Sequence, residues 1–509
     1  MKAYTIPKSP TTEAQKMYLN RQIKHHAKQA PGSIAINFGT ETISFVKLCT
    51  RADHAAAILQ NEYAVQAGDR VTYLGLNHPD MLVILLACEQ LGAIFNPLNS
   101  RLAKAEYEYL LSDAEPKVLF ADPAFWHMAQ ELAGTGLQLA SLDRLHDTIQ
   151  RPLAMAEARA DEDDALLLVY TSGTTGRPKG VVLSRRAVEA NIANCHDLYG
   201  FEPGQKVQIT LPLFHVGGLC ILLLPALTHG AAIHLHQKFD PVAALDEIAQ
   251  HKITTTIFVP AQMAAMMEMS RWETSDLSSM DYVVVGSSII PLAQIQKFHA
   301  KGIPVSQLYG ATETGPGAIG LEIGNTRDKE GSAGTALANC EIEVRGPDRN
   351  PLPTGEHGDI WVRGDNILTH YWQNEAETQM VLVDGWYNTG DIGFIDPDDH
   401  YWIIDRSKDV IISGGENIYP AEIEAASLEH PAIAAIAVVG RQDPKWGETP
   451  VAAVELEEGH SLDLQTFQSF LTDRLARFKH PKDLLVVEQL PRNGMGKIEK
   501  SVLRQQVNS

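Results

Sequence analysis

Cysteine is scarce in this 509-residue chain, and long apolar runs are absent. The five cysteines are widely spaced and none forms a CxxC pair, so neither a zinc site nor a disulfide framework is indicated. The apolar runs Met81–Cys88 and Leu219–Leu227 are too short to span a bilayer. The polar N-terminal segment contains no apolar signal-peptide core. We therefore expect a cytoplasmic protein whose cysteines are reduced.

An excess of basic residues is also absent. The chain has 42 lysines and arginines against 63 aspartates and glutamates, a net charge of −21 that is spread along the sequence. This balance argues against a general nucleic-acid or anionic-membrane binder. The 44% hydrophobic and 21% charged fractions are those of an ordinary globular protein. At this length we expect two or three domains, because a single core does not grow to 509 residues.

Alternating strand and helix patterns dominate from Arg70 to Leu308 and predict a layered α/β fold with mostly parallel sheets. Past residue 335, short strands separated by Gly, Pro and Asp turns predict an antiparallel sheet or a small barrel. A final α+β unit of about one hundred residues begins near Arg406 and includes a helix predicted over Leu464–Arg477. The strands expected in the alternating part are Val71–Leu74, Ala93–Asn96, Lys117–Ala121, Lys206–Leu211, Ala231–His236, Thr255–Val259, Tyr282–Val285 and Val305–Leu308.

A stretch rich in glycine and hydroxyl residues follows the apolar run Ala165–Val169. It reads Tyr170-Thr171-Ser172-Gly173-Thr174-Thr175-Gly176-Arg177-Pro178-Lys179-Gly180. Glycines let successive backbone N–H groups converge on an anion, and the hydroxyls and Lys179 add donors for phosphate oxygens. The spacing from Gly173 to Lys179 does not fit the GxxxxGK[ST] loop. The stretch predicts a polyphosphate-binding loop, with an ordinary surface loop as the alternative.

This stretch closely resembles the signature of the adenylate-forming superfamily, which includes acyl-CoA synthetases, luciferases and the adenylation domains of peptide synthetases. Four further segments resemble the superfamily in the same order: Tyr309–Thr314, Trp386–Asp391, Asp405–Asp409 with Gly414–Asn417, and Pro491–Lys497. The resemblance covers roughly residues 20 to 505 and is nearest to fatty-acid, 4-coumarate and feruloyl acyl-CoA ligases.

The resemblance implies a domain organisation. Residues 1–405 are expected to form a large α/β domain that binds AMP and the acyl group and includes a small antiparallel β-barrel part. Residues 406–509 are expected to form a small mobile α+β lid that carries the catalytic lysine and turns about a hinge at Lys408.

The resemblance also implies an ATP-dependent carboxylate–CoA ligase. Such an enzyme forms an acyl-adenylate with release of pyrophosphate, then a CoA thioester with release of AMP. ATP, Mg²⁺ and coenzyme A are the expected small molecules beside the acid. An adenylating enzyme that serves a carrier protein or another acceptor is the alternative. A nucleotide-binding regulatory protein is disfavoured, because Lys179, Glu313, Asp391 and Lys497 are all present.

Site residues follow from the matched motifs. Lys497, His215, Thr312 and Glu313 are the expected catalytic residues, and Glu313 is also the expected magnesium ligand, since a hard cation relieves the repulsion between a carboxylate and phosphates. The residues expected to bind ATP are Thr171, Ser172, Gly173, Thr174, Thr175, Lys179, Gly286, Ser287, Tyr309, Gly310, Thr312, Asp391, Arg406 and Lys497. Those expected to bind CoA are Gly414, Gly415, Trp446, Phe478, His480 and Lys482.

The acyl pocket is expected to be lined by His215–Gly218, Val259–Met263, Gly286–Ile289 and Ala311–Gly317. These segments hold no arginine or lysine, so a second carboxylate would be buried without a partner. No acid stands in Leu211–Val216 to receive an α-amine, and no carrier domain follows Ser509. We therefore expect a monocarboxylic acid, either medium- or long-chain aliphatic or aromatic, and free CoA as the acceptor. The sequence leaves the oligomeric state open, and a homodimer is one alternative.

Bulky side chains at three pocket glycines are expected to shorten the accepted acyl chain. These glycines are Gly286, Gly315 and Gly317.

Overall fold

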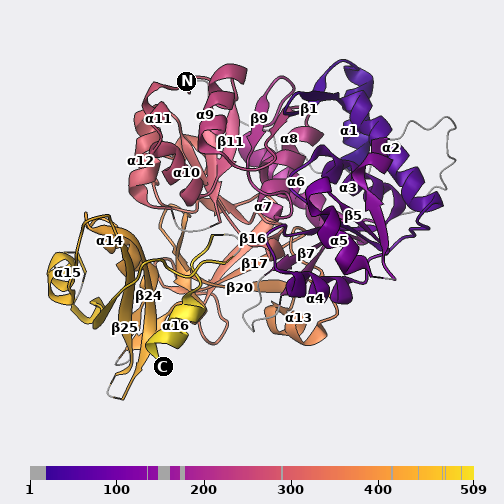
Figure 1. Ribbon diagram of the computed structural model, residues 1–509. Coiled ribbons are helices and arrows are strands. Elements are labelled where there is room, and N and C mark those ends of the chain that lie inside the picture. The colour runs from indigo at the N-terminus through magenta and orange to yellow at the C-terminus, as the bar shows by residue number, and fades with distance from the viewer. Residues whose placement is uncertain are drawn as a thin grey trace. The chain divides into compact units, whose positions relative to one another are not determined.

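The computed structural model describes residues 19–134, 136–146, 161–171, 178–287, 290–413, 416–444, 446–472, 474–475, 477–493 and 496–509. The chain forms two compact units (Figure 1). The first comprises residues 1–342 and 362–387, and the second comprises residues 343–361 and 388–509. The predicted boundary at residue 405 separates a large domain from a lid that moves relative to it, and this boundary stays a prediction.

A nine-stranded sheet is the centre of the first unit. Its order is β15-β14-β13-β12-β11-β9-β10-β1-β2. The strands from β13 to β1 are parallel, as predicted from the alternating pattern, whereas β2, β14 and β15 run antiparallel to their neighbours. The strands are β1 (Ile34–Phe38), β2 (Glu41–Ser44), β9 (Lys206–Ile209), β10 (Ala232–Leu235), β11 (Thr255–Phe258), β12 (Tyr282–Gly286), β13 (Val305–Tyr309), β14 (Ile319–Gly320) and β15 (Thr335–Ala336).

A seven-stranded sheet of order β18-β8-β7-β4-β3-β5-β6 is also part of the first unit. Its strands are β3 (Arg70–Leu74), β4 (Ile94–Leu98), β5 (Val118–Ala121), β6 (Gln138–Ser141), β7 (Ala165–Thr171), β8 (Lys179–Ser184) and β18 (His370–Tyr371). Strands β3 to β7 pair in parallel, and β8 folds back on β7 as an antiparallel hairpin. The residues of the phosphate-loop motif between these two strands, 172–177, lie outside the described residues.

Helices cover both sheets. The helices of this unit are α1 (Leu19–Gln29), α2 (Phe45–Asn61), α3 (Pro79–Leu91), α4 (Lys104–Ala114), α5 (Trp126–Ala133), α6 (Arg185–Tyr199), α7 (Val216–Gly218), α8 (Leu224–Thr228), α9 (Pro241–His251), α10 (Pro260–Met267), α11 (Arg271–Thr274), α12 (Leu292–Ala300) and α13 (Glu375–Val381). Helix α3 is buried on nearly every side, which explains its continuous apolar sequence. Helices α9 to α12 enclose a core against β11–β13 (Figure 1), where Trp272 and Phe298 meet edge to face at 4.8 Å.

Two smaller sheets complete the chain: the first lies where the sequence predicts an antiparallel sheet or barrel, and the second is antiparallel apart from its β25–β26 pair. A curled sheet contains β16 (Cys340–Arg345), β17 (Gly358–Gly364), β19 (Leu382–Val383), β20 (Trp386–Ile395) and β21 (Tyr401–Arg406). A second sheet contains β22 (Ile411–Ser413), β23 (Glu416–Ile418), β24 (Ile433–Asp443), β25 (Gly447–Leu456) and β26 (Asp483–Val486). Helices α14 (Pro420–Ser427), α15 (Leu464–Leu471) and α16 (Lys500–Val507) accompany this second sheet.

The helix predicted over Leu464–Arg477 is too long. Helix α15 ends at Leu471, and a separate 3₁₀ turn covers Arg477–Lys479. Leu475 still packs on the same core as Phe467 and Leu471, so the apolar spacing continues past the end of the helix. Apolar periodicity reports which side chains face a core, and it cannot report where backbone hydrogen bonding stops.

Candidate functional site

The segments predicted to line the acyl pocket follow neighbouring parallel strands. His215, Val259, Ser287 and Gly310 come shortly after β9, β11, β12 and β13, which are adjacent in that order. The carboxyl ends of parallel strands lie at one edge of a sheet, where open α/β folds bind their ligands. The fold therefore brings these segments together at this edge. Residues 288–289 of the predicted lining lie outside the described residues.

Close backbone contacts shape four of the positions predicted to bind ATP. Gly286 pairs with Leu308 on β13, and a Cβ on Gly286 would lie 2.7 Å from the Leu308 carbonyl oxygen. Ser287 has a φ of +77°, an unusual conformation for a residue with a side chain. Tyr309, at the end of β13, is half-buried, and any side chain on Gly310 would collide with the Pro316 carbonyl.

The expectation that bulk at the pocket glycines shortens the acyl chain is wrong for two of the three. A Cβ on Gly315 would lie 2.5 Å from the Asn366 carbonyl oxygen, and Gly315 has a φ of +78°. Side chains at Gly286 and Gly315 would therefore meet backbone rather than pocket space. At Gly317 the contact is a side-chain oxygen of Asn191 at 3.1 Å. Gly217, in the same predicted lining, has open space, with Ile221 nearest at 4.0 Å.

The β7–β8 hairpin places Thr171 directly opposite Lys179 at the mouth of the phosphate loop. The loop residues Ser172, Gly173, Thr174 and Thr175 lie outside the described residues. The Lys179 Nζ donates to the Glu377 carboxylate and lies 5.4 Å from the centre of the Tyr371 ring. Both charged side chains are largely buried, so the hairpin carries a fixed cation at its mouth.

Glu313 lies in a 3₁₀ turn, Thr312–Thr314, that follows β13. The Tyr371 hydroxyl donates to Glu313 Oε1 at 2.8 Å. Burial, together with the adjacent Glu313 carboxylate, raises the pKa of Tyr371 well above its usual value, so this hydroxyl keeps its proton. Tyr371 thus contacts both Lys179 and Glu313, and it links the two predicted ATP-binding segments.

Two buried asparagines hold the chain that follows Glu313. The Asn366 side-chain amide donates to the carbonyls of Thr314 and Gly317 at 2.7 and 2.8 Å. Asn191 Oδ1 accepts from the Gly317 N–H at 2.9 Å. Both asparagines are fully buried. Because these backbone groups are satisfied by side chains from other elements, this part of the predicted acyl-pocket lining has a defined position.

His215 precedes α7 and is half-buried. Its carbonyl accepts the N–H groups of Gly218 and Leu219, each at 3.0 Å, and its ring centre lies 5.2 Å from that of Phe214. Asn77, which is buried, binds the adjoining segment through the Leu211 carbonyl and the Leu213 N–H. The backbone that carries His215 is therefore held from both sides.

The second unit contains two of the residues predicted to bind ATP, and their motifs lead us to expect them at the ribose. Asp391 on β20 and Arg406 on β21 are cross-strand partners, and Arg406 Nε lies 2.7 Å from Asp391 Oδ1. The Asp391 side chain is almost fully buried, whereas that of Arg406 is half exposed. The Asp391 N–H donates to Thr389 Oγ1, which in turn donates to the Ile360 carbonyl, so the acid has an anchored backbone.

Lys497 lies on a tight turn of the same unit. The Asn493 N–H donates to the Lys497 carbonyl at 2.9 Å, and the Lys497 N–H donates to Asn493 Oδ1 at 3.1 Å. Gly496 supplies a φ of +79° for this turn. Lys497 interacts electrostatically with Arg406 and Asp391. The predicted catalytic lysine therefore belongs to the same charged group as the predicted ribose-binding residues.

Lys408 lies in a 3₁₀ turn, Ser407–Asp409, whose neighbours are tied to later elements. Asp405 accepts the Ala421 N–H of α14 at 2.8 Å, and Asp409 pairs with Arg504 of α16 at 2.8 Å. Lys408 itself is exposed and flanked by these two anchored acids. The hinge role of Lys408 stays a prediction.

The predicted CoA-binding residues differ in their exposure. Trp446 is exposed, with 46% of its surface accessible, and its N–H donates to Asp443. His480 is buried, and its Nε2 lies 3.0 Å from the Leu475 carbonyl. The Lys482 N–H donates to the Pro450 carbonyl. Gly414 and Gly415 lie outside the described residues, as does the side chain of Phe478. Their CoA role stays a prediction.

The sequence analysis missed Tyr371, Glu377, Asn191 and Asn366. Tyr371 and Glu377 lie 58 and 198 residues from their partners Glu313 and Lys179, so no local pattern connects them. Glu377 is an acid in the first turn of α13, which is common and carries no functional signal; its importance comes from facing Lys179. That facing becomes visible only in three dimensions.

Comparison with known proteins identifies the family. Residues 23–372 match the AMP-binding enzyme family, and residues 422–497 match the AMP-binding enzyme C-terminal domain. The chain belongs to this family, and the prediction of the adenylate-forming superfamily is confirmed. The predicted α/β fold, with a large N-terminal and a smaller C-terminal part, is confirmed as well.

Three relatives are informative. The chain is 41% identical to an indoleacetate–CoA ligase of Aromatoleum aromaticum, over 96% of this chain and 98% of that protein. It is 36% identical to a feruloyl-CoA synthase of an Amycolatopsis species, over 94% and 96%. The o-succinylbenzoate CoA synthetase of Bacillus subtilis, solved with its acyl-adenylate intermediate, has a TM-score of 0.87 and 31% identity, over 96% and 98%. The same synthetase has been solved with ATP and a magnesium ion.

These matches confirm the predicted class of enzyme, an AMP-forming acyl-CoA synthetase that uses ATP. Among the described residues, no helix combines the length and apolarity needed to cross a bilayer.

Proposed function

We propose that the protein activates an aromatic monocarboxylic acid and transfers it to coenzyme A, with Mg²⁺ accompanying ATP. The observation that carries this proposal is the 41% identity to an indoleacetate–CoA ligase over nearly the whole of both chains. A feruloyl-CoA synthase at 36% identity supports an aromatic acid. The apolar segments after β9, β11, β12 and β13 supply the surface that a flat, uncharged ring requires.

In the first half-reaction, a carboxylate oxygen of the acid attacks the α-phosphorus of ATP and pyrophosphate leaves. We assign Lys179 and Thr171 to the departing phosphates, since they are cross-strand partners at the two ends of the phosphate-loop motif. Glu313 suits a hard cation, because its carboxylate is oriented by the Tyr371 hydroxyl. Magnesium there would neutralise phosphate charge; Lys179 supplies a second, permanent positive charge.

In the second half-reaction, the thiolate of CoA attacks the acyl carbonyl and AMP leaves. We assign Asp391 to the ribose hydroxyls, because a carboxylate accepts two hydrogen bonds at once. Lys497 would serve the first half-reaction only, since it sits on the part that we propose to turn about Lys408. The boundary near residue 405 is part of this proposal. It is supported by the ties of Asp405 and Asp409 to α14 and α16.

The acid panel tests the substrate. We expect kcat/KM for indoleacetate, phenylacetate or a cinnamate to exceed that for hexanoate and dodecanoate. Malonate and succinate should be poorer than the best acid by at least about 10²-fold, because a second buried carboxylate lacks a cation. A dicarboxylate preferred by the enzyme would refute the monocarboxylate assignment, and an aliphatic acid preferred over every aromatic acid would refute the aromatic one.

The acceptor is tested in the same assay. Pyrophosphate release and CoA-thioester formation are followed separately for the best acid. Thioester formation at the rate of pyrophosphate release supports free CoA. Accumulation of acyl-adenylate in saturating CoA would instead support the carrier-protein alternative.

A further inference from the structure

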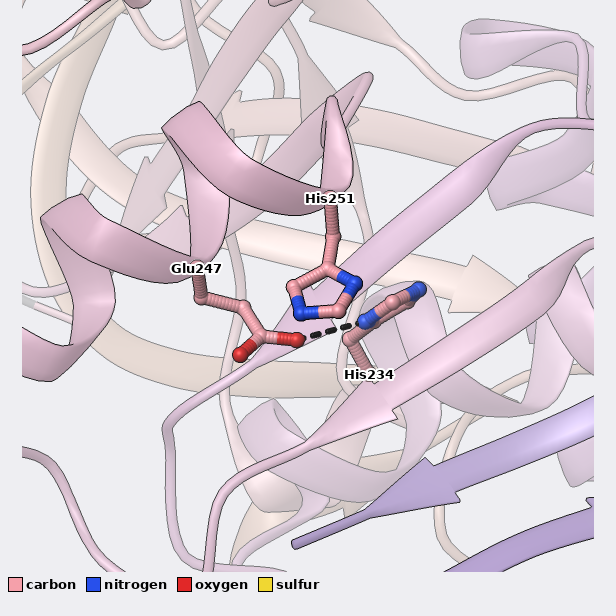
Figure 2. A group of neighbouring side chains, drawn as sticks. All are labelled: His234, Glu247 and His251. Carbon is pink, nitrogen blue, oxygen red and sulfur yellow. Dashed lines mark hydrogen bonds and ion pairs between the residues drawn. The ribbon is translucent and has the colours of Figure 1, made fainter. Parts of the chain in front are cut away.

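A group of three potential metal ligands lies away from the residues assigned to the reaction. His234 is on β10, and Glu247 and His251 are four residues apart on α9. Figure 2 shows the three side chains pointing toward one another from these two elements. Each offers one ligand atom, and these atoms lie within 4.8 Å of one another. Among the residues that the structure describes, this is the one such group.

The inner part of the group is already ordered. His234 is buried, with 3% of its side chain exposed, and its Nδ1 lies 2.6 Å from Glu247 Oε1. The hydrogen bond from His234 holds the pKa of Glu247 below its usual value, so the carboxylate is ionised. The other ring nitrogen of His234, Nε2, lies 3.3 Å from the Asn37 side-chain amide. This contact fixes the ring of His234, and its Nε2 accepts from the Asn37 amide while Nδ1 faces Glu247.

The outer part of the group is accessible. His251 is exposed and ends α9, so an ion can enter past it. Its ring centre lies 5.3 Å from that of His234. Two ligands of a tetrahedral zinc ion, each about 2.0–2.1 Å from the metal, are about 3.3 Å apart. His234 Nδ1 and Glu247 Oε1 would therefore separate by less than 1 Å, about the change that rotation of a carboxylate allows. The exposed His251 imidazole would move in to complete the three protein ligands.

We propose that His234, Glu247 and His251 bind one divalent transition-metal ion of the zinc class and tie α9 to β10. Two imidazoles and one carboxylate suit Zn²⁺, Cu²⁺ or Ni²⁺ and are a poor set for Mg²⁺, which prefers oxygen ligands. The fourth position is left to water. On binding, Nδ1 gives its proton to solvent and Nε2 takes one up, so His234 stays neutral, and the Asn37 amide would turn its oxygen toward the new N–H. No redox change occurs.

Other charged groups nearby set limits on affinity. Lys206 donates to the His251 carbonyl at 2.8 Å, and its positive charge opposes a cation. His236 also influences Glu247, but its Nε2 accepts from the Gln208 side-chain amide. Asp240 interacts with His236. The site thus has a single carboxylate and one opposing lysine, and we expect micromolar rather than nanomolar affinity.

Zinc titration of the chelator-treated full-length protein tests the proposal. Calorimetry in excess MgCl₂, which occupies magnesium sites, should show one equivalent of Zn²⁺ bound, and differential scanning fluorimetry should show a higher Tm with zinc. His251→Ala changes an exposed residue and should weaken binding at least about 10-fold, a typical effect of removing a ligand contact. Because the readout is binding, its failure leaves the acyl-CoA ligase assignment intact.

A matched control is available on α5. His127 and Glu131 repeat the four-residue spacing with an imidazole–carboxylate distance of 3.2 Å, but no third ligand joins them among the described residues. His127→Ala should leave zinc affinity and the zinc-dependent Tm unchanged. The proposal is overturned if zinc fails to bind at 1:1, if His251→Ala binds like the wild type, or if Co²⁺ gives a thiolate charge-transfer band that assigns the ion to a cysteine.

Discussion

At the scale of single residues, the ATP-binding segments are joined by contacts rather than by sequence. Tyr371 packs beside Lys179 through its ring and donates to Glu313 through its hydroxyl. One side chain thus places both the phosphate-loop cation and the proposed magnesium ligand. We expect Tyr371 to orient these two groups, whereas we expect Lys497 to act on the substrate directly.

Tyr371→Phe should lower the rate of pyrophosphate release by about 10-fold or more, since a hydrogen bond to a charged group is worth about 1.5–3 kcal/mol. The ring remains, so folding should be unaffected. The Mg²⁺ concentration for half-maximal activity should rise. Tyr107→Phe is the matched control, because its hydroxyl donates to the Asn99 carbonyl, away from these residues. Unchanged Mg²⁺ dependence would show that Tyr371 does not orient Glu313.

Lys497→Ala should lose about 10²–10³-fold or more in adenylation, the scale of removing one preorganised charge partner. Thioester formation from a preformed acyl-adenylate should largely survive. Stopped assays of each half-reaction measure both. Lys497→Arg, which keeps the charge on the same turn, should recover part of the adenylation rate. Equal losses in both half-reactions would contradict a role confined to the first.

At the scale of elements, a change in the 3₁₀ turn around Lys408 should affect one half-reaction and spare the other. Proline fixes φ near −65° and should hold the turn in one conformation. Lys408→Pro should keep acid-dependent pyrophosphate exchange and make little CoA thioester. Lys408→Ala should keep pyrophosphate exchange and also form the thioester. If the proline variant ran both half-reactions at the wild-type rate, the hinge would have to lie elsewhere.

Gly217 provides a test of the acyl-pocket elements. Its Cβ position is open, unlike those of Gly286 and Gly315, where backbone carbonyls stand 2.7 and 2.5 Å away. Gly217→Ala should fold normally and lower kcat/KM for the bulkiest acids about 10-fold, while the KM for ATP stays constant. Gly286→Ala should instead lower the Tm and affect every acid alike. An identical acid profile in Gly217→Ala and wild type would remove this segment from the pocket.

The sequence predicted the elements better than it predicted the contacts between them. Strands β3, β9, β12 and β13 agree with prediction within one or two residues, because buried parallel strands are short apolar runs between turn residues. The end of α15 was misplaced because Leu475 continues the apolar spacing. Glu377 and Asn366 were missed, since polar residues gain meaning from partners brought together by the fold.

At the scale of the whole molecule, two stacked histidines predict an acid limit to stability. His196 and His229 lie ring on ring with centroids 3.5 Å apart. Burial lowers the pKa of His196, and burial followed by the adjacent His196 lowers the pKa of His229 to about 4. His26 opposes protonation of His229 further, whereas Asp197 and a hydrogen bond with the Pro225 carbonyl favour it.

Both histidines are therefore neutral in the folded protein and titrate near pH 6.5 when unfolded. Their contribution to the free energy of unfolding is complete above about pH 6.5 and is lost as pH falls toward 4. For His229 the loss is on the order of 2–3 kcal/mol. The apparent Tm should fall over this window. His229→Gln should flatten the profile, and His127→Gln, at an exposed site, should not. A wild-type Tm that stays constant from pH 7 to 5 would contradict this account.

The residues at the mouth of the phosphate loop also act as a filter on the ionic form of the nucleotide. Lys179 brings one positive charge, while Glu377 and Glu313 bring two negative ones. A bare polyphosphate would add to an existing excess of negative charge and compete with Glu377 for the lysine. A nucleotide that arrives with its own countercharge meets neither obstacle. If ATP binds here as proposed, we expect the enzyme to discriminate between the metal-free and metal-bound forms of the nucleotide before any part of the base or the sugar is recognised.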